Sequence, residues 1–188
     1  MSKRLFIAVK IPLEQPTLDA FYSFKDALSY EAVKWVNPQG IHLTLKFLGD
    51  TDEDIIPLID EDLQQIAEKY TASQAMVKGV GVFPDLQRPR VIWFGMDNTD
   101  LLTLLAQDID QQMAQLDYEK EKRPFVPHIT MGRIKYLRDR RILRRLVDRY
   151  KDTYFQNVDI DEFILFQSDL RPSGAVYTAL GKYPLKKD

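Results

Sequence analysis

The chain has 188 residues, of which 45% are hydrophobic and 11% are aromatic. This composition supports a packed core and excludes a disordered chain. The 26 basic and 28 acidic residues give a formal net charge of −2, so any contact with nucleic acid must be local. The chain has no cysteine, which excludes disulfides, thiolate metal sites and cysteine nucleophiles and is typical of a reducing compartment.

The start of the chain does not resemble a signal peptide, because its apolar run covers only residues 5–9 and ends at Lys10. No stretch approaches the ~18 apolar residues that a membrane span requires. We therefore expect a cytoplasmic protein without a membrane partner.

Residue patterns predict strands and helices in alternation along the chain. Apolar, β-branched and aromatic runs predict strands at 4–11, 33–36, 41–48, 75–83, 91–96, 126–134, 163–167 and 176–180. Apolar residues at helical spacing predict helices at 16–28, 51–70, 101–116 and 137–150. Turn-forming residues cluster at 37–40, 84–89 and 168–174.

The order strand, helix, strand, helix, strand occurs once in each half of the chain. This order favours a duplicated α+β architecture with two lobes. Because no linker or low-complexity segment divides the halves, we expect the lobes to share an interface and form a single domain over residues 1–188.

The two histidines of the chain, His42 and His128, lie in the same short pattern. The segments His-Leu-Thr-Leu and His-Ile-Thr-Met both read His-x-Thr-x, with an apolar residue at each x. Side chains alternate between the faces of a strand, so His42 shares a face with Thr44, and His128 shares one with Thr130. Each segment thus places an imidazole beside a hydroxyl, with apolar anchors on the other face.

A single His-x-Thr is most simply a structural histidine on a strand. Threonine is about one residue in twenty, so two independent matches arise by chance in roughly one chain in 400. The pair therefore indicates a functional site.

Two imidazoles with two hydroxyls suit the cleavage of a phosphodiester. Histidine titrates near neutrality, so one neutral imidazole can act as base while a protonated one acts as acid. The hydroxyls can donate hydrogen bonds to the phosphoryl oxygens. A zinc site is a weaker interpretation, because two distant histidines without cysteine lack the usual ligand spacing. A serine hydrolase is weaker again, because no Gly-x-Ser-x-Gly is present. We expect no metal and no cofactor.

With these motifs, the chain resembles the two-histidine phosphoesterase superfamily, which is defined by paired His-x-Thr/Ser-x motifs. Within it, the chain looks like the RNA 2′,3′-cyclic phosphodiesterases, also called 2′-5′ RNA ligases. The resembling stretches run nearly end to end, at 5–9, 35–38, 42–49, 83–84, 88–93 and 127–133. The resemblance implies a bilobal α+β fold with two antiparallel sheets, outer helices and a central cleft where the motifs face each other.

The resemblance also implies a reaction, the opening of a 2′,3′-cyclic phosphate at an RNA 3′ end to give a 2′-phosphate. His42 resembles the proton donor of the family and His128 its proton acceptor, while Thr44 and Thr130 would hold the phosphate. The same site could join a 2′,3′-cyclic phosphate to a 5′ hydroxyl and so act as a 2′-5′ RNA ligase. The expected partner is RNA with a cyclic phosphate end, bound by a monomer.

Two other functions stay open at this point. One is a phosphodiesterase for small cyclic nucleotides or ADP-ribose cyclic phosphate, as other members of the superfamily are. The other is a module that binds RNA ends without turning them over.

Further residues near the motifs are candidate substrate contacts. Lys46 shares the face of the first histidine if its strand is regular, where it is either a phosphate ligand or a solvated lysine. Arg133 falls on the face away from the second histidine, unless Gly132 introduces a bulge. Phe47 can stack on a base, but alternation places it in the core. A basic run on the last predicted helix is usually a solvated face, yet it can also grip an RNA backbone: Arg138, Arg140, Arg141, Arg144, Arg145 and Arg149.

Overall fold

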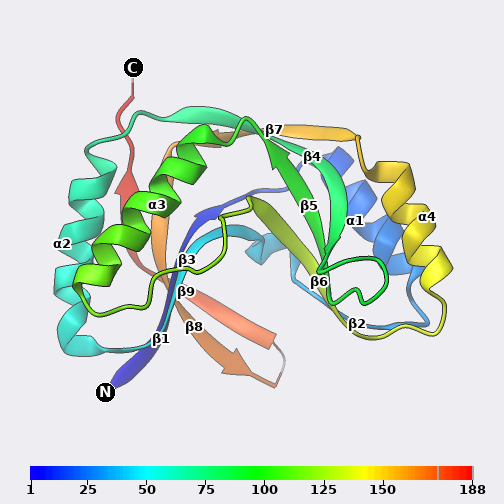
Figure 1. Cartoon of the computed structure of the whole chain (residues 1–188), viewed down its shortest axis with the longest axis horizontal. Helices are drawn as coiled ribbons and strands as arrows, with labels where there is room; N and C mark the ends of the chain where they lie inside the picture. Colours follow the sequence, from blue (N-terminus) through cyan, green and yellow to red (C-terminus); the bar gives the residue numbers. More distant parts are fainter. Residues whose placement is uncertain (173, 188) are drawn as a thin grey trace.

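The computed structural model describes residues 1–172 and 174–187. Over these residues the chain forms two antiparallel sheets and four α-helices (Figure 1). The elements are β1 (Ser2–Lys10), α1 (Gln15–Ala27), β2 (Ala32–Trp35), β3 (His42–Asp52), α2 (Ile56–Ala67), β4 (Ser73–Phe83), β5 (Val91–Asp97), α3 (Asp100–Gln115), β6 (His128–Tyr136), α4 (Arg140–Tyr150), β7 (Tyr154–Ile160), β8 (Glu162–Arg171) and β9 (Gly174–Pro184). Short 3-10 turns precede β3 and α2, at Pro38–Gly40 and Glu53–Ile55.

Each sheet carries its own pair of helices, and we name the two halves of the molecule accordingly. Lobe A contains the sheet β3-β1-β8-β9, with α2 and α3 packed against it. Lobe B contains the sheet β2-β6-β5-β4-β7, with α1 and α4 packed against it. The predicted α+β class with two antiparallel sheets and outer helices is confirmed.

The lobes do not correspond to the two halves of the sequence. The chain begins in lobe A with β1, crosses to lobe B for α1 and β2, and returns for β3 and α2 (Figure 1). It later crosses again for β4 and β5, for α3, for β6 to β7, and finally for the β8–β9 hairpin. The repeated order of elements therefore does not mark two separate folding units along the chain.

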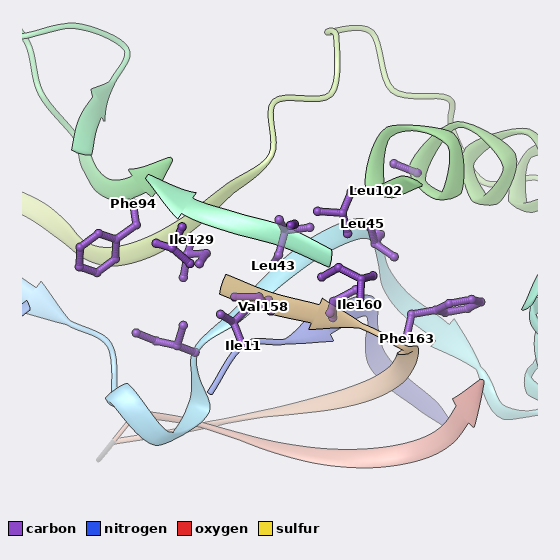
Figure 2. Packing of buried hydrophobic residues seen from close by; sticks show 14 of the residues in the cluster. Ile11, Leu43, Leu45, Phe94, Leu102, Ile129, Val158, Ile160 and Phe163 are labelled. Atoms are coloured by element: carbon purple, nitrogen blue, oxygen red, sulfur yellow. The ribbon is translucent and has the colours of Figure 1, made fainter. Parts of the chain in front are cut away.

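The buried apolar side chains of both lobes form one continuous cluster. Figure 2 shows Leu43 and Leu45 of β3 and Ile129 of β6 among residues contributed by other strands of both sheets. Met131 belongs to the same cluster, so all four apolar x residues of the two motifs lie in it. The core thus holds the two motif strands from the face opposite to the histidines.

The sequence patterns did not predict β7, because its polar residues interrupt the apolar alternation. Gln156 in this strand is 3% exposed, and both the oxygen and the nitrogen of its side-chain amide are hydrogen-bonded. Its Oε1 accepts from the backbone N–H of Glu14 at 2.8 Å and from Oγ1 of Thr17 at 2.6 Å, and its Nε2 donates to the carbonyl of Pro12 at 2.9 Å. A buried amide with this many partners fixes the start of α1 to lobe B.

Three predicted boundaries move in the structure. The helix expected at 51–70 begins at Ile56, because β3 continues through Thr51 to pair with β1. The helix expected at 137–150 begins after Asp139, whose side chain accepts from the N–H of Arg141 and caps it. The turn expected at 168–174 is shorter, because β8 and β9 continue to pair as far as Arg171 and Gly174. Ser173 in that turn, like Asp188, lies outside the described residues.

In the part of the chain that the structure describes, no helix has the length and apolar composition needed to cross a membrane.

The shared core predicts that both lobes unfold together. Ile129→Ala should lower the free energy of unfolding by about 2–5 kcal/mol, because it opens a cavity at a fully buried position between the lobes. Urea unfolding followed by circular dichroism and by tryptophan fluorescence measures this, since Trp35 and Trp93 both lie in lobe B. The control Leu58→Ala, at a side chain that is 51% exposed on α2, should change stability by less than about 0.5 kcal/mol. Separate transitions for the two probes would contradict a single folding unit.

Candidate active site

The two histidines have the same local environment in their separate lobes. Each is the first residue of its strand, His42 in β3 and His128 in β6. His42 Nδ1 lies 2.9 Å from the carbonyl oxygen of Gly40, and His128 Nδ1 lies 2.7 Å from that of Val126. A carbonyl can only accept, so each Nδ1 carries a proton and donates it. In both rings this leaves Nε2 as the nitrogen that can accept or donate a proton in a reaction.

Both motif strands contain a bulge at the same motif position. In β3, Thr44 and Lys46 pair with consecutive residues of β1, so Leu45 has no partner of its own. In β6, the residues on either side of Met131 likewise pair with consecutive residues of β5. The extra residue is the last x of each His-x-Thr-x. A bulge puts two residues opposite one, which reverses the alternation of faces beyond it.

The bulge in β3 exchanges the expected positions of Lys46 and Phe47. Lys46 is 2% exposed, and its Nζ donates to Asp110 Oδ1 at 2.5 Å and to the carbonyl of Glu119 at 3.0 Å. The expectation that it shares the face of the first histidine is therefore wrong. Phe47, expected in the core, is 59% exposed, and its ring centroid lies 6.0 Å from that of Phe6.

The bulge in β6 brings Arg133 onto the face of His128, where a regular strand would have placed it on the other side. Arg133 is exposed. Burial raises the pKa of Tyr177, a residue of lobe A, and lowers that of His128, and the positive charge of Arg133 acts on both groups by favouring the deprotonated form. The sequence placed Arg133 near the second histidine only if a bulge precedes it, and β6 contains such a bulge. The bulged residue is Met131 rather than Gly132. A Cβ on Gly132 would lie 3.0 Å from one side-chain carbon each of Trp35 and Val33 on β2, so glycine permits this close packing.

Thr44 and Thr130 follow their histidines two residues along the same strands, before the bulges, and both are half-buried. β3 and β6 contact each other across the two lobes. The pairs His42–Thr44 and His128–Thr130 therefore lie on adjoining strands, each on the face opposite to its apolar anchors.

Aromatic side chains from neighbouring strands surround each imidazole. The ring of Phe6 lies 4.9 Å from His42 between centroids, and Tyr177 lies 5.1 Å away and nearly perpendicular to it. Phe83 lies 4.9 Å from His128 at 88°. Motif analysis does not find these residues, because they come from β1, β9 and β4. Their only signal would be cross-strand pairing, which the sequence does not give.

These aromatic surroundings affect protonation. Burial lowers the pKa of His42 below its ordinary 6.5, and the hydrogen bond to the Gly40 carbonyl offsets this only in part. Burial also lowers the pKa of His128 below 6.5. The hydrogen bond to the Val126 carbonyl offsets part of this effect, and the charge of Arg133 makes a smaller lowering contribution. Both imidazoles are thus mostly neutral at pH 7 in the free protein. The expected coexistence of a neutral and a protonated ring at that pH requires a bound anion that favours the imidazolium.

The buried ion pair of Lys46 holds the segment that leads into the second motif. Asp110 Oδ1 on α3 also accepts from the N–H of Glu121 at 3.1 Å. Strand β3, helix α3 and the segment before β6 therefore meet at one lysine. Beside Phe47 this segment lines a cavity of about 500 Å³. Within residues 1–172 and 174–187, no three His, Asp or Glu side chains gather as metal ligands would.

The arrangement can carry out acid–base chemistry on an anion. Two Nε2 atoms are available for proton transfer, two hydroxyls can donate to oxygens, and one guanidinium supplies positive charge. These are the parts that displacement at a phosphodiester requires. The site and fold define a phosphoesterase of the two-histidine type.

Comparison with known proteins agrees with this class. The family model described as the 2′-5′ RNA ligase superfamily matches residues 17–172. The chain belongs to this superfamily, which confirms the resemblance drawn from the motifs.

Named relatives and solved structures extend the match over nearly the whole chain. An RNA 2′,3′-cyclic phosphodiesterase of Aquifex aeolicus is 37% identical over 154 residues, covering 81% of each chain. One of Methanocaldococcus jannaschii is 31% identical over 183 residues, covering 96% of this chain and 99% of that protein. The crystal structure of a Thermus thermophilus protein, TT0787, superposes with a TM-score of 0.80 at 27% identity, covering 98% of this chain and 99% of that one.

The buried position of Lys46 predicts a structural rather than a substrate-binding effect. Lys46→Met should lower the free energy of unfolding by about 1–3 kcal/mol, because Asp110 is left without its ion-pair partner while only 19% exposed. Adding Asp110→Asn should recover part of the loss, because the unpaired charge is removed. Urea unfolding of the single and double variants checks this. A variant of wild-type stability with a raised KM would instead indicate that Lys46 binds substrate.

Proposed function

We propose that this protein hydrolyses the 2′,3′-cyclic phosphate at an RNA 3′ end to a 2′-phosphate, without a metal ion. The observation that carries the proposal is the pair of matching His-x-Thr-x strands. In each, Nδ1 is hydrogen-bonded to a carbonyl, and Nε2 has no hydrogen-bond partner among residues 1–172 and 174–187. Relatives at 30–37% identity that are named RNA 2′,3′-cyclic phosphodiesterases support the substrate.

In the proposed step, the two imidazoles move protons in opposite directions. Nε2 of neutral His128 takes a proton from water, and the water oxygen forms a bond to phosphorus. The bond from phosphorus to O3′ breaks, and protonated His42 gives the Nε2 proton to O3′. The product carries a 2′-phosphate and a free 3′ hydroxyl. His128 is left protonated and His42 neutral, and exchange with solvent restores both.

The hydroxyls and one guanidinium stabilise the charge of the transition state. Thr44 and Thr130 donate to the non-bridging oxygens, and Arg133 offsets negative charge on the His128 side. In the free protein, burial keeps the pKa of His42, the proton donor, below its ordinary value. The bound phosphate anion raises this pKa, because it favours the imidazolium. With a 5′ hydroxyl attacking phosphorus in place of water, the same step joins two ends by a 2′-5′ bond, and O3′ again leaves with the proton from His42.

Product mapping tests this function directly. The protein should convert a cyclic-phosphate RNA to an RNA with a 2′-phosphate only. A mixture with the 3′-phosphate would contradict the assigned leaving oxygen. Turnover of small cyclic nucleotides or ADP-ribose cyclic phosphate in place of RNA would favour the alternative substrates. Tight RNA-end binding without turnover would favour a binding module.

Substitution of the histidines should show that they act in one step. His42→Ala and His128→Ala should each lower kcat by roughly 10²–10⁴, because each removes one proton transfer. The double variant should lose much less than the product of the two effects. Single-turnover hydrolysis of cyclic-phosphate RNA gives the rates. Thermal unfolding serves as control, and near wild-type turnover in either single variant would remove that histidine from the mechanism.

The lowered pKa values predict the pH dependence. kcat/KM reports the free enzyme, in which one imidazole must be protonated and one neutral while both pKa values lie below 6.5. Its optimum should therefore lie below pH 6.5, and that of kcat at higher pH, because the bound phosphate stabilises the imidazolium. Arg133→Gln should raise the pKa of His128, so the limb of the kcat/KM profile that reports this residue should move to higher pH. A kcat/KM optimum above pH 7, with chemistry rate-limiting, would contradict the assignment.

A further inference from the structure

The net charge of the chain is close to zero, but basic and acidic residues are unevenly distributed along it. Residues 133–151 hold nine of the 26 basic residues but two of the 28 acidic ones, a net charge of +7. The rest of the chain therefore carries −9. One of the two acids, Asp139, is paired with Arg141 at 3.0 Å and also caps α4. This segment forms the end of β6 and the whole of α4, so the positive charge is confined to lobe B.

The structure connects this charge to the candidate active site through the loop between β4 and β5. Arg133 lies on the face of His128, and the N–H of the next residue, Ile134, donates to the carbonyl of Arg90 at 2.8 Å. Nη1 of Arg140 on α4 donates to the carbonyl of Gln87 at 2.6 Å. These hydrogen bonds attach the loop to β6 on one side and to α4 on the other.

The loop has a fixed shape that presents its arginines outward. Asp85 Oδ1 accepts from the N–H groups of Gln87 at 2.7 Å and Arg88 at 2.9 Å. The N–H of Arg90 donates to the carbonyl of Phe83 at 2.7 Å. The acid of the loop is thus engaged by backbone donors, while Arg88 and Arg90 are exposed.

Exposed arginines continue from the loop onto α4. Arg144 lies one helical turn beyond Arg140, on the same side of the helix. Both are exposed. We call Arg88, Arg90, Arg140 and Arg144 the basic track; it starts next to Arg133 and leads away from the site over the outer part of lobe B.

We propose that the basic track binds the phosphate backbone of the RNA strand that precedes the cyclic phosphate. This inference rests on the proposed function, because that function sets which end of the RNA lies in the site. Arginine matches phosphate oxygens with a fork of donors, and a row of arginines leading out of the site can follow successive phosphates. The protein then prefers an oligonucleotide over a cyclic mononucleotide, because only the longer substrate reaches the track.

The test compares two pairs of substitutions with equal loss of charge. Arg88→Gln with Arg144→Gln removes two charges of the track; within the described residues neither side chain takes part in an ion pair or a hydrogen bond to another side chain. Lys186→Gln with Lys187→Gln, called the lobe A variant, removes two exposed charges that follow β9 of lobe A, at the end of the chain that Figure 1 shows far from α4. Thermal unfolding confirms that both are folded. Arg88→Lys with Arg144→Lys keeps the charge and should retain most of the affinity.

The readout is kcat/KM at several salt concentrations for a cyclic-phosphate RNA of about ten nucleotides and for a 2′,3′-cyclic mononucleotide. Each single-strand phosphate contact contributes a slope of about −0.7 to log K against log salt, so two lost contacts should flatten the slope by about 1.4. At low salt the track variant should lose about tenfold on the oligonucleotide and nothing on the mononucleotide. The lobe A variant should match the wild type on both.

Three results would overturn the track. In the first, the track variant has the same kcat/KM on the oligonucleotide as the lobe A variant. In the second, the track variant loses kcat/KM equally on the oligonucleotide and the mononucleotide. In the third, the wild type has the same kcat/KM on both substrates. The first result would indicate that the basic track binds another kind of partner, such as an acidic protein. Binding of an RNA that already ends in a 2′-phosphate is measured in parallel. If the wild type hydrolyses no cyclic phosphate, the proposed function fails, and this binding measurement still decides the track by the same comparison.

Discussion

The packing of four apolar side chains into one core is the constraint on which the rest of this structure depends. Leu43, Leu45, Ile129 and Met131 come from two strands in two sheets, yet they meet in a single buried cluster. Because side chains alternate, burying these residues turns the histidine and threonine of each motif to the other face. The same burial orients both catalytic candidates, and the bonds from Nδ1 to carbonyl oxygens then set which ring nitrogen is available.

The bulges add a second level of control. Without them, the residues after each motif would continue the alternation, with Lys46 toward the site and Arg133 away from it. The bulges reverse this in both strands, so one strand offers an exposed aromatic ring and the other an exposed guanidinium at equivalent positions. The buried lysine gains an aspartate on α3 and ties the segment before β6 to β3. One extra residue per strand therefore changes both the chemistry and the stability of the site.

Much of this was predictable from the sequence, and the exceptions have a common cause. The His-x-Thr-x pair, the two-lobed α+β class and most elements follow from local patterns and from the resemblance of the motifs. Lys46, Phe47 and Arg133 could not be placed, because the register of β3 and β6 depends on their partners β1 and β5. Strand β7 was not predicted, because a glutamine interrupts its apolar pattern. Gln156 can be buried only because the start of α1, distant in the sequence, supplies its hydrogen bonds. The aromatic neighbours of the histidines, and hence the lowered pKa values, likewise arise from distant strands.

The interleaved path of the chain has a consequence for movement. A hinge between lobes usually needs one or two connecting segments that can bend. Here the polypeptide passes between lobe A and lobe B repeatedly, and the connections enter the sheets at several places. Any rotation of one lobe against the other would strain all of these connections and part the common core. The separation of the two imidazoles is consequently set by the shared core and by the repeated crossings of the chain, rather than by the angle of a hinge.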